Sequence, residues 1–176
     1  MKTYSLVLKI VLVGILTVPL RLYFDSNEIK RINYKVNHGS VILNVPTAVK
    51  MFNSIEVYSK KYDIPLKYAL GIAYVETRYQ GPFHWSYNPQ QKSSAGALGP
   101  MQIMPGTANY VWERKIPKDQ LISNIDFNVE TSMKVLRRLH DKYGNWKLVF
   151  GCYNTGRPCI NGYAEKIYNF NPKSKK

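Results

Sequence analysis

The chain has 176 residues, 45% of them hydrophobic and 20% charged, a composition typical of one globular domain and not of a disordered chain. Lys and Arg total 25 against 11 Asp and Glu, so the formal net charge is +14. This charge favours an anionic partner, such as nucleic acid, anionic lipid or the acidic polymers of a bacterial wall. We expect no nucleic-acid partner, because no motif for one is present and the basic residues are spread along the chain.

The first 24 residues, "MKTYSLVLKIVLVGILTVPLRLYF", predict a targeting segment. Two lysines precede an uncharged apolar stretch from Ile10 to Leu20, which suits the core of a signal peptide and is short for a full membrane span. A membrane anchor is the alternative, because no small-residue cleavage site follows; a buried N-terminal helix is a third, less favoured one. A signal peptide or an anchor would place the domain outside the cytoplasm. Residues 25–45 are polar and basic and predict a linker, and residues 171–176 predict a basic tail.

The next elements are two helices. The first is expected from Pro46 to about Lys61, because Pro suits the first position of a helix. Its apolar stripe is predicted to be Val49, Phe52, Ile55 and Ser59. The second helix starts at Asp63 and Pro65, and its inward stripe is predicted to be Leu66, Ala69, Leu70, Ala73 and Thr77, opposite Lys67, Gly71 and Arg78.

Residues 81–106 are dense in Gly, Pro, Ser and Asn and predict a long loop, which in a small domain usually serves function. A short helix capped by Thr107 follows. An amphipathic helix is then expected over Asp126–Tyr143, with Gly144 as its stop. The apolar "WKLVFGCYN" predicts a shorter helix, and the last helix is expected from about Ile160. No convincing strand is present, so the predicted fold class is all-α.

Glu76 is the acidic residue of chemical interest. It lies on the shoulder of the inward stripe of the second helix, so its carboxylate faces apolar surroundings and its pKa should rise. A carboxyl group of this kind can act as a general acid near neutral pH. The alternative is a structural Glu at a helix end, paired with a neighbouring Arg or Lys.

Two segments further along the chain strengthen the catalytic interpretation. The string "SSAGALGPMQIMPGTA" runs from Ser93 to Ala108, and "CYNTG" follows from Cys152 to Gly156. With Glu76-Thr77 and the "YAEKI" segment, they resemble the motifs of the soluble-type lytic transglycosylase family over roughly residues 50–170. "DFNVETSMKVLRRL" is similar to the helix that lies between the last two motifs in that family. The resemblance implies a goose-lysozyme-like helical catalytic domain, here residues 46–170.

The resemblance also implies a substrate and a reaction. Enzymes of this family cleave the peptidoglycan bond between N-acetylmuramic acid and N-acetylglucosamine and leave an anhydro-muramoyl product. Glu76 would be the single general acid and base. The substrate-binding residues implied by matching positions are Ser93, which would hydrogen-bond Glu76; Gln102, Tyr153 and Asn154, which would hold the sugar; and Met101, which would shape the cleft floor.

Other interpretations stay open. The same fold could serve a lysozyme that uses water, or a non-catalytic module that binds the wall or an assembly. The implied partner is the peptidoglycan glycan strand, with the membrane surface and a secretion or phage assembly as further candidates. The implied location is periplasmic or membrane-anchored facing the wall, or phage-associated.

The sequence departs from the family at three positions. Thr77 stands where Ser is common, Pro100 where Leu is common, and Thr155 where Ala is common. The segment "YQGPFHWSYNPQQK" is also longer than usual. Its aromatic residues predict either a sugar-stacking wall or a loop pinned to the domain: Phe83, Trp85 and Tyr87.

Two cysteines and three histidines complete the residues with chemical potential. Cys152 and Cys159 lie seven positions apart, and the histidines (His38, His84 and His140) match no ligand spacing, so no metal or other cofactor is expected. If the chain is exported the two cysteines could form a disulfide, and two free thiols are an equal alternative.

Overall fold

The computed structural model describes residues 45–172. The predicted targeting segment and nearly all of the predicted linker lie outside these residues, as does most of the basic tail. The helices of the described part are α3 (Thr47–Lys61), α4 (Leu66–Thr77), α5 (Pro105–Trp112), α6 (Lys118–Ser123), α7 (Ile125–Tyr143), α8 (Trp146–Thr155) and α9 (Gly162–Tyr168). Within 45–172 the only β-type pairing is a pair of isolated bridges in one loop, so the all-α prediction is confirmed. None of the helices described is long and apolar enough to cross a membrane.

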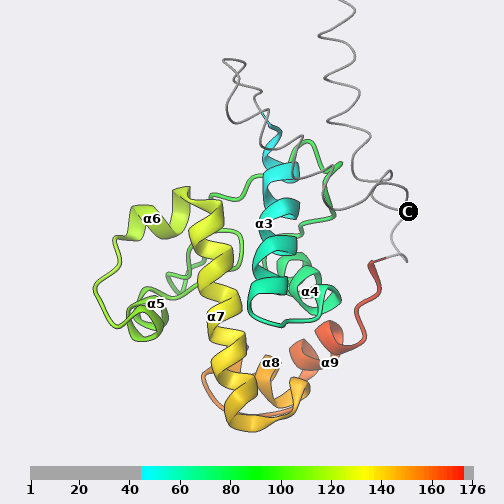
Figure 1. Ribbon diagram of the computed structural model, residues 1–176, viewed down its shortest axis with the longest axis vertical. Helices are drawn as coiled ribbons and strands as arrows, with labels where there is room; N and C mark the ends of the chain where they lie inside the picture. Colours follow the sequence, from blue (N-terminus) through cyan, green and yellow to red (C-terminus); the bar gives the residue numbers. More distant parts are fainter. Residues whose placement is uncertain (1–44, 173–176) are drawn as a thin grey trace, which may run out of the picture. The chain divides into compact units, whose positions relative to one another are not determined.

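The longest helix, α7, is central to the packing. It contacts α3, α5, α6 and α8, while α9 packs on both α4 and α8. Figure 1 shows α7 in yellow alongside α3 in cyan, with α8 and α9 gathered at one end of the pair. One continuous core joins these helices; its fully buried members include Met51, Ile55, Ile72, Met133, Leu136, Phe150 and Ile167.

The helix ends follow the capping rules at most positions. Gly144 stops α7 in the left-handed conformation with φ of 62°, as predicted. Asn124 begins the same helix by accepting a hydrogen bond from the Phe127 amide. The predicted cap at Thr107 is wrong, because α5 begins at Pro105 and Thr107 lies inside it; proline needs no amide partner at a helix start. The last helix begins at Gly162, two positions after the expected start at about Ile160, and Ile160 itself is 56% exposed.

The predicted inward stripes are partly wrong. In α3, Ile55 and Ser59 are buried as expected, but Val49 and Phe52 are only half-buried. Ala48 and Met51 take their places, because α3 is covered by both α4 and α7. The buried face is therefore set by two neighbours and not by one apolar stripe.

Helix α4 differs at Gly71, which was predicted to face outward and is buried. A Cβ at this position would lie 3.1 Å from Phe170, so the missing side chain lets the C-terminal residues pack against α4. Leu66, predicted to face inward, is 38% exposed. Helix α6 was not predicted, since six residues are too few to show a helical period.

Candidate active site

Glu76 lies in the last turn of α4, and its carboxylate is held by a tyrosine. The Tyr163 hydroxyl of α9 donates a hydrogen bond to Oε1 of Glu76. Burial raises the pKa of the Glu76 carboxyl, and the Tyr163 bond opposes that rise only in part. No salt bridge to Glu76 exists among residues 45–172, so no Arg or Lys of this part of the chain pairs with it as the structural alternative expects.

Tyr163 is a site residue that the sequence analysis did not select. Its pKa is raised well above the usual value, first by burial and then by the Glu76 carboxylate, so the hydroxyl stays a neutral donor. Asn161 fixes the start of α9 by accepting a hydrogen bond from the Ala164 amide at 2.9 Å. Tyr163 is the first residue of the "YAEKI" segment that was matched to the family, and its hydroxyl in that segment was the available signal.

Tyr153 of α8 lies close enough to Glu76 for the carboxylate to raise the pKa of its hydroxyl, although burial is the larger cause. The Tyr153 hydroxyl donates to the carbonyl oxygen of Met101 at 2.8 Å and lies 2.9 Å from the Ser132 hydroxyl. It thus joins α8 and α7 to the long loop. A direct hydrogen bond from Tyr153 to a sugar stays a prediction.

The loop between α4 and α5 carries all of the "SSAGALGPMQIMPGTA" string except its last four residues, which begin α5. The loop is ordered by its own hydrogen bonds. Leu98 and Ile103 exchange two backbone hydrogen bonds of 2.9 Å each. The Ser93 hydroxyl accepts a hydrogen bond from the Ala97 amide at 2.9 Å and so closes a turn. The predicted hydrogen bond between Ser93 and Glu76 is not among those of the described residues, where the Ser93 hydroxyl bonds the Ala97 amide and Glu76 bonds Tyr163.

Asn128 of α7 clamps this loop and was also not selected from the sequence. Its side chain is fully buried; Oδ1 accepts from the Met101 amide at 2.9 Å, and Nδ2 donates to the carbonyl oxygens of Leu98 (2.9 Å) and Leu121 (2.8 Å). Gly99 allows this approach, because a Cβ there would lie 2.5 Å from Nδ2 of Asn128 and the φ is +75°. The available signal was a polar residue on the inward face of an amphipathic helix.

Thr77 connects the end of α4 to two places in the long loop, Tyr87 and Pro100. Its hydroxyl lies 2.9 Å from the Pro100 carbonyl oxygen, to which it donates, and 2.9 Å from the Tyr87 hydroxyl. The departure from Ser therefore keeps the hydroxyl contacts, and Pro100 takes part through its carbonyl and not its missing amide. The residue beside Glu76 is held from two sides.

The remaining predicted site residues differ in exposure. Met101 is fully buried, so its side chain supports the loop from within the core. Gln102 is half-buried with its side-chain nitrogen donating to the Gly99 carbonyl at 2.8 Å, and its backbone has a φ of 51°. Asn154 is exposed, and its oxygen accepts a hydrogen bond of 3.3 Å from Asn161. Gln102 and Asn154 thus retain surface that a ligand can reach.

The aromatic segment after α4 divides between the two predicted roles. Tyr87 is buried and pins the loop, as the second alternative predicts. Phe83 and Trp85 are 49% and 58% exposed and lie edge to face, with ring centroids 5.9 Å apart. These two rings are free to stack on a ligand, and the sugar-wall role stays a prediction for them.

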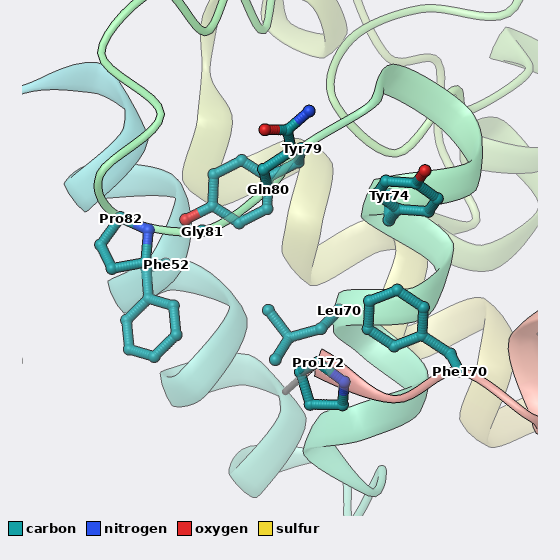
Figure 2. Close-up of a pocket in the computed structure, with 9 residues that line it drawn as sticks. All are labelled: Phe52, Leu70, Tyr74, Tyr79, Gln80, Gly81, Pro82, Phe170 and Pro172. Carbon is teal, nitrogen blue, oxygen red and sulfur yellow. The ribbon is translucent and has the colours of Figure 1, made fainter. Parts of the chain in front are cut away.

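A hollow of about 170 Å³ lies elsewhere on the domain (Figure 2). Its lining comes from α3, α4, the start of the long loop and the C-terminal residues: Phe52, Leu70, Tyr74, Tyr79, Gln80, Gly81, Pro82, Phe170 and Pro172. None of the predicted site residues lines it.

Other acidic groups lie apart from Glu76 in the described residues. Asp63 has a fully solvated side chain, 99% exposed, and Glu130 is paired with Lys61. No neighbouring carboxylate contributes to the raised pKa of Glu76. Within residues 45–172 no group of three His, Cys, Asp or Glu side chains is arranged to hold a metal ion.

The family follows from comparison with known proteins. A family model described as the transglycosylase SLT domain matches residues 53–175, which is more than half of the chain. The chain belongs to the transglycosylase SLT domain family. The resemblance stated from the motifs is thereby confirmed.

Similar SLT-domain proteins include the soluble lytic murein transglycosylases of Salmonella typhimurium and Escherichia coli, each 32% identical over 106 residues. The matched region is 56% of this chain and 15% of each relative, so the chain corresponds to a small part of those proteins. The crystal structure of the 70 kDa soluble lytic transglycosylase from Escherichia coli is similar with a TM-score of 0.51 and 26% identity, over 66% of this chain and 18% of that one. A complex of the 70 kDa soluble lytic transglycosylase with bulgecin A matches equally well, so the SLT-type, lysozyme-like fold is confirmed.

Proposed function

We propose that this SLT domain is a peptidoglycan lytic transglycosylase in which Glu76 is the single general acid and base. The observation that carries the proposal is a half-buried carboxyl group with a raised pKa, bonded to a neutral tyrosine and free of any ion pair in the described residues. Its relatives named as soluble lytic murein transglycosylases support murein as the substrate.

The first step uses Glu76 in its protonated form. The carboxyl proton passes to the oxygen that bridges N-acetylmuramic acid and N-acetylglucosamine, and the bond from the muramoyl anomeric carbon to that oxygen breaks. The acetylglucosamine leaves as an alcohol, and positive charge develops at the anomeric carbon. Burial favours this step, because the proton is held at a higher pH than on an exposed Glu.

The second step uses the carboxylate that remains. It accepts the proton of the muramoyl 6-hydroxyl while that oxygen bonds to the anomeric carbon, which closes the anhydro ring. Glu76 returns to its protonated state, and no water is consumed. Most glycosidases need a second carboxylate as nucleophile or base, whereas here the substrate supplies its own nucleophile. The developing cation would be stabilised by the N-acetyl oxygen of the substrate or by fixed dipoles nearby.

Tyr163 has a defined part in this cycle. Its hydroxyl donates to Oε1 of Glu76, so it orients the carboxyl group and stabilises the carboxylate formed after the first step. The same hydroxyl stays neutral because its own pKa is raised. The remaining oxygen of Glu76 is then the one that exchanges the proton with the glycan.

The other predicted residues are given supporting roles. Gln102 and Asn154 keep reachable surface and would bind the sugars beside the scissile bond. Met101 and Tyr153 would hold the loop that carries Gln102, since the Tyr153 hydroxyl donates to the Met101 carbonyl.

The net charge of +14 supports a wall-facing location, because anionic wall polymers and anionic lipid would both attract the domain. Such attraction should weaken as salt is added, with a screening length of about 10 Å at 0.1 M. The first 24 residues would provide the route out of the cytoplasm, as a signal peptide or an anchor.

The products of peptidoglycan digestion test the reaction. Mass spectrometry should show muropeptides that end in anhydro-muramic acid, each lighter by one water than the product of a lysozyme. In isotopically labelled water, ring closure should incorporate no label, because the nucleophile belongs to the substrate. Labelled, reducing muramic acid ends would instead establish a lysozyme, and no release of muropeptides would favour the non-catalytic module.

A further inference from the structure

The two cysteines of the sequence both lie near the turn between α8 and α9. Cys152 lies on α8, and Cys159 lies in the turn that leads to Asn161, the cap of α9. Both are half-buried and both are free thiols in the structure. The sequence contains no third cysteine.

Gly151 shows how closely the turn packs on α8. A Cβ at Gly151 would lie 1.7 Å from the carbonyl oxygen of Cys159 and 3.1 Å from its Sγ. Only a residue without a side chain fits there, and it directly precedes Cys152. Cys159 therefore packs directly on the turn of α8 that carries Cys152.

Thr155 fixes the place of the Cys159 sulfur from the other side. Its Oγ1 lies 3.6 Å from Sγ of Cys159. Thr155 follows Cys152 by three positions, and residues three apart are neighbours on a helix surface, with Cβ atoms about 5–6 Å apart. The sulfur of Cys159 thus lies beside residues 151 and 155, at the edge of the helix face that Cys152 occupies.

We propose that Cys152 and Cys159 form an intramolecular disulfide bond that closes the turn between α8 and α9 under oxidising conditions. The oxidant is a small-molecule or protein disulfide. The thiolate of one cysteine attacks it, forming a mixed disulfide and releasing one thiolate. The thiolate of the second cysteine then attacks the protein sulfur of that mixed disulfide, forms the Cys152–Cys159 bond and releases the second thiolate. Two protein thiols lose two hydrogens in total, and one external disulfide becomes two thiols.

The bond would brace residues of the candidate active site. Nδ2 of Asn161 lies 3.7 Å from Sγ of Cys159 and donates to the oxygen of Asn154 at 3.3 Å. Tyr163, the donor to Glu76, comes two positions after Asn161. A disulfide between Cys152 and Cys159 would limit the motion of this turn. It would thereby help to hold Asn161 and Tyr163 in their positions.

The experiment uses the full chain in buffers of oxidised and reduced glutathione. After oxidation the intact mass should fall by about 2 Da, and neither thiol should react with an alkylating reagent. The melting temperature should rise by about 5–10 °C relative to the reduced protein, since the link restricts the unfolded chain. Cys152→Ser and Cys159→Ser should each abolish the thermal shift.

A pair of glycine variants tests the packing that carries the proposal. Gly151→Ala forces Cys159 away from α8 and should slow disulfide formation about tenfold or more. Gly162→Ala is the matched control, because a Cβ there meets nothing within 4 Å, and it should form the bond at the wild-type rate. Circular dichroism confirms that each variant is folded.

Several results would overturn the proposal. Two thiols that stay open to alkylation, a glutathione adduct on each cysteine, or a disulfide-linked dimer on a non-reducing gel would each do so. Equal rates in the two glycine variants would remove its structural basis. None of these readouts needs the glycan reaction, so this proposal and the proposed function fail separately.

Discussion

Two half-buried glutamates of this domain have opposite surroundings. Glu130 of α7 accepts a hydrogen bond from the Tyr62 hydroxyl at 3.1 Å and lies 2.5 Å from the Lys61 ammonium. Glu76 of α4 also accepts a tyrosine hydroxyl, that of Tyr163, but has no cation beside it in the described residues. One carboxylate is held between two helices by a charge, and the other is held by a neutral group alone.

The contrast between the two glutamates indicates which surroundings make a carboxyl group a good proton donor in a small helical domain. Burial alone makes the anion costly, and a nearby ammonium removes that cost. A tyrosine hydroxyl has an effect between that of burial alone and that of an ammonium group. It orients the carboxylate, but it does not cancel the rise in pKa that burial causes. The domain has an ion pair at Glu130, where α3 meets α7, and none in the described residues at Glu76, where the proposed mechanism needs proton exchange.

The same substitution at both positions tests this contrast between the two glutamates most directly. Glu76→Gln should lower the release of anhydro-muropeptides by about a thousandfold or more, because an amide cannot donate the proton. Glu130→Gln should stay within about twofold of the wild type, since it removes only a structural contact. Both are measured as soluble muropeptides released per unit time, with circular dichroism to confirm the fold. A large loss in Glu130→Gln would show that the two sites do not differ as described.

The second test removes the hydrogen bonds by which Asn128 of α7 holds the long loop. Asn128→Ala removes the hydrogen-bond partner of the buried Met101 amide and of the Leu121 carbonyl, while the Leu98 carbonyl keeps its bond from the Ile103 amide. The substitution should lower the free energy of unfolding by about 3 kcal/mol. Asn124→Ala is the matched control on the same helix, because it removes an exposed cap bond worth about 1 kcal/mol. Urea unfolding followed by circular dichroism measures both. Equal losses in the two variants would show that Asn128 is not a clamp.

The third test removes each tyrosine hydroxyl in turn. Activity requires protonated Glu76 and so falls as pH rises through its pKa; the Tyr163 bond lowers that pKa. Tyr163→Phe should therefore move the falling limb of the pH profile to higher pH, with a loss of about tenfold in rate at the optimum from poorer orientation. Tyr62→Phe, at Glu130, should leave the profile in place. A shift to lower pH in Tyr163→Phe would contradict the proposed role of the bond.

The smallest expected effect is on stability. The folded state keeps the Glu76 proton above the ordinary pKa of 4.5, so it binds more protons than the unfolded state there, and wild-type stability falls as pH rises from 4.5 through the raised pKa. Glu76→Gln lacks this penalty and should melt about 2 °C higher than the wild type at pH 7. The difference should vanish below pH 4.5, where the carboxyl is protonated in both states. Scanning calorimetry at several pH values checks both the sign and the window.

Much of the helical scaffold could be predicted from the sequence, because each long helix carries its own periodic pattern and its own stop. The stretch that ends at Gly144 shows this, since its apolar period and its glycine are both local. Helix α6 has too few residues to show a period. The outward placement of Gly71 was wrong because its burial depends on Phe170, which is distant in the sequence.

The candidate site shows the same limit. Glu76 could be selected from its helix and from the motifs that follow it. Tyr163 lies 87 positions further along the chain, and only the packing of α9 on α4 brings its hydroxyl to the carboxylate. Asn128 was not selected for a similar reason. Its hydrogen-bond partners lie in the long loop and at Leu121, and only the fold brings them together.

The position of Glu76 along α4 has an electrostatic consequence of its own. The helix ends at the next residue, and Arg78 turns the backbone with a φ of 59°. Aligned peptide dipoles leave about half a negative charge at the end of a helix, which disfavours an anion there. The backbone therefore pushes the carboxyl group toward its protonated form in addition to the effect of burial. Had the same side chain been carried by the first turn of a helix, the backbone would instead have stabilised its anion and made it a poorer proton donor.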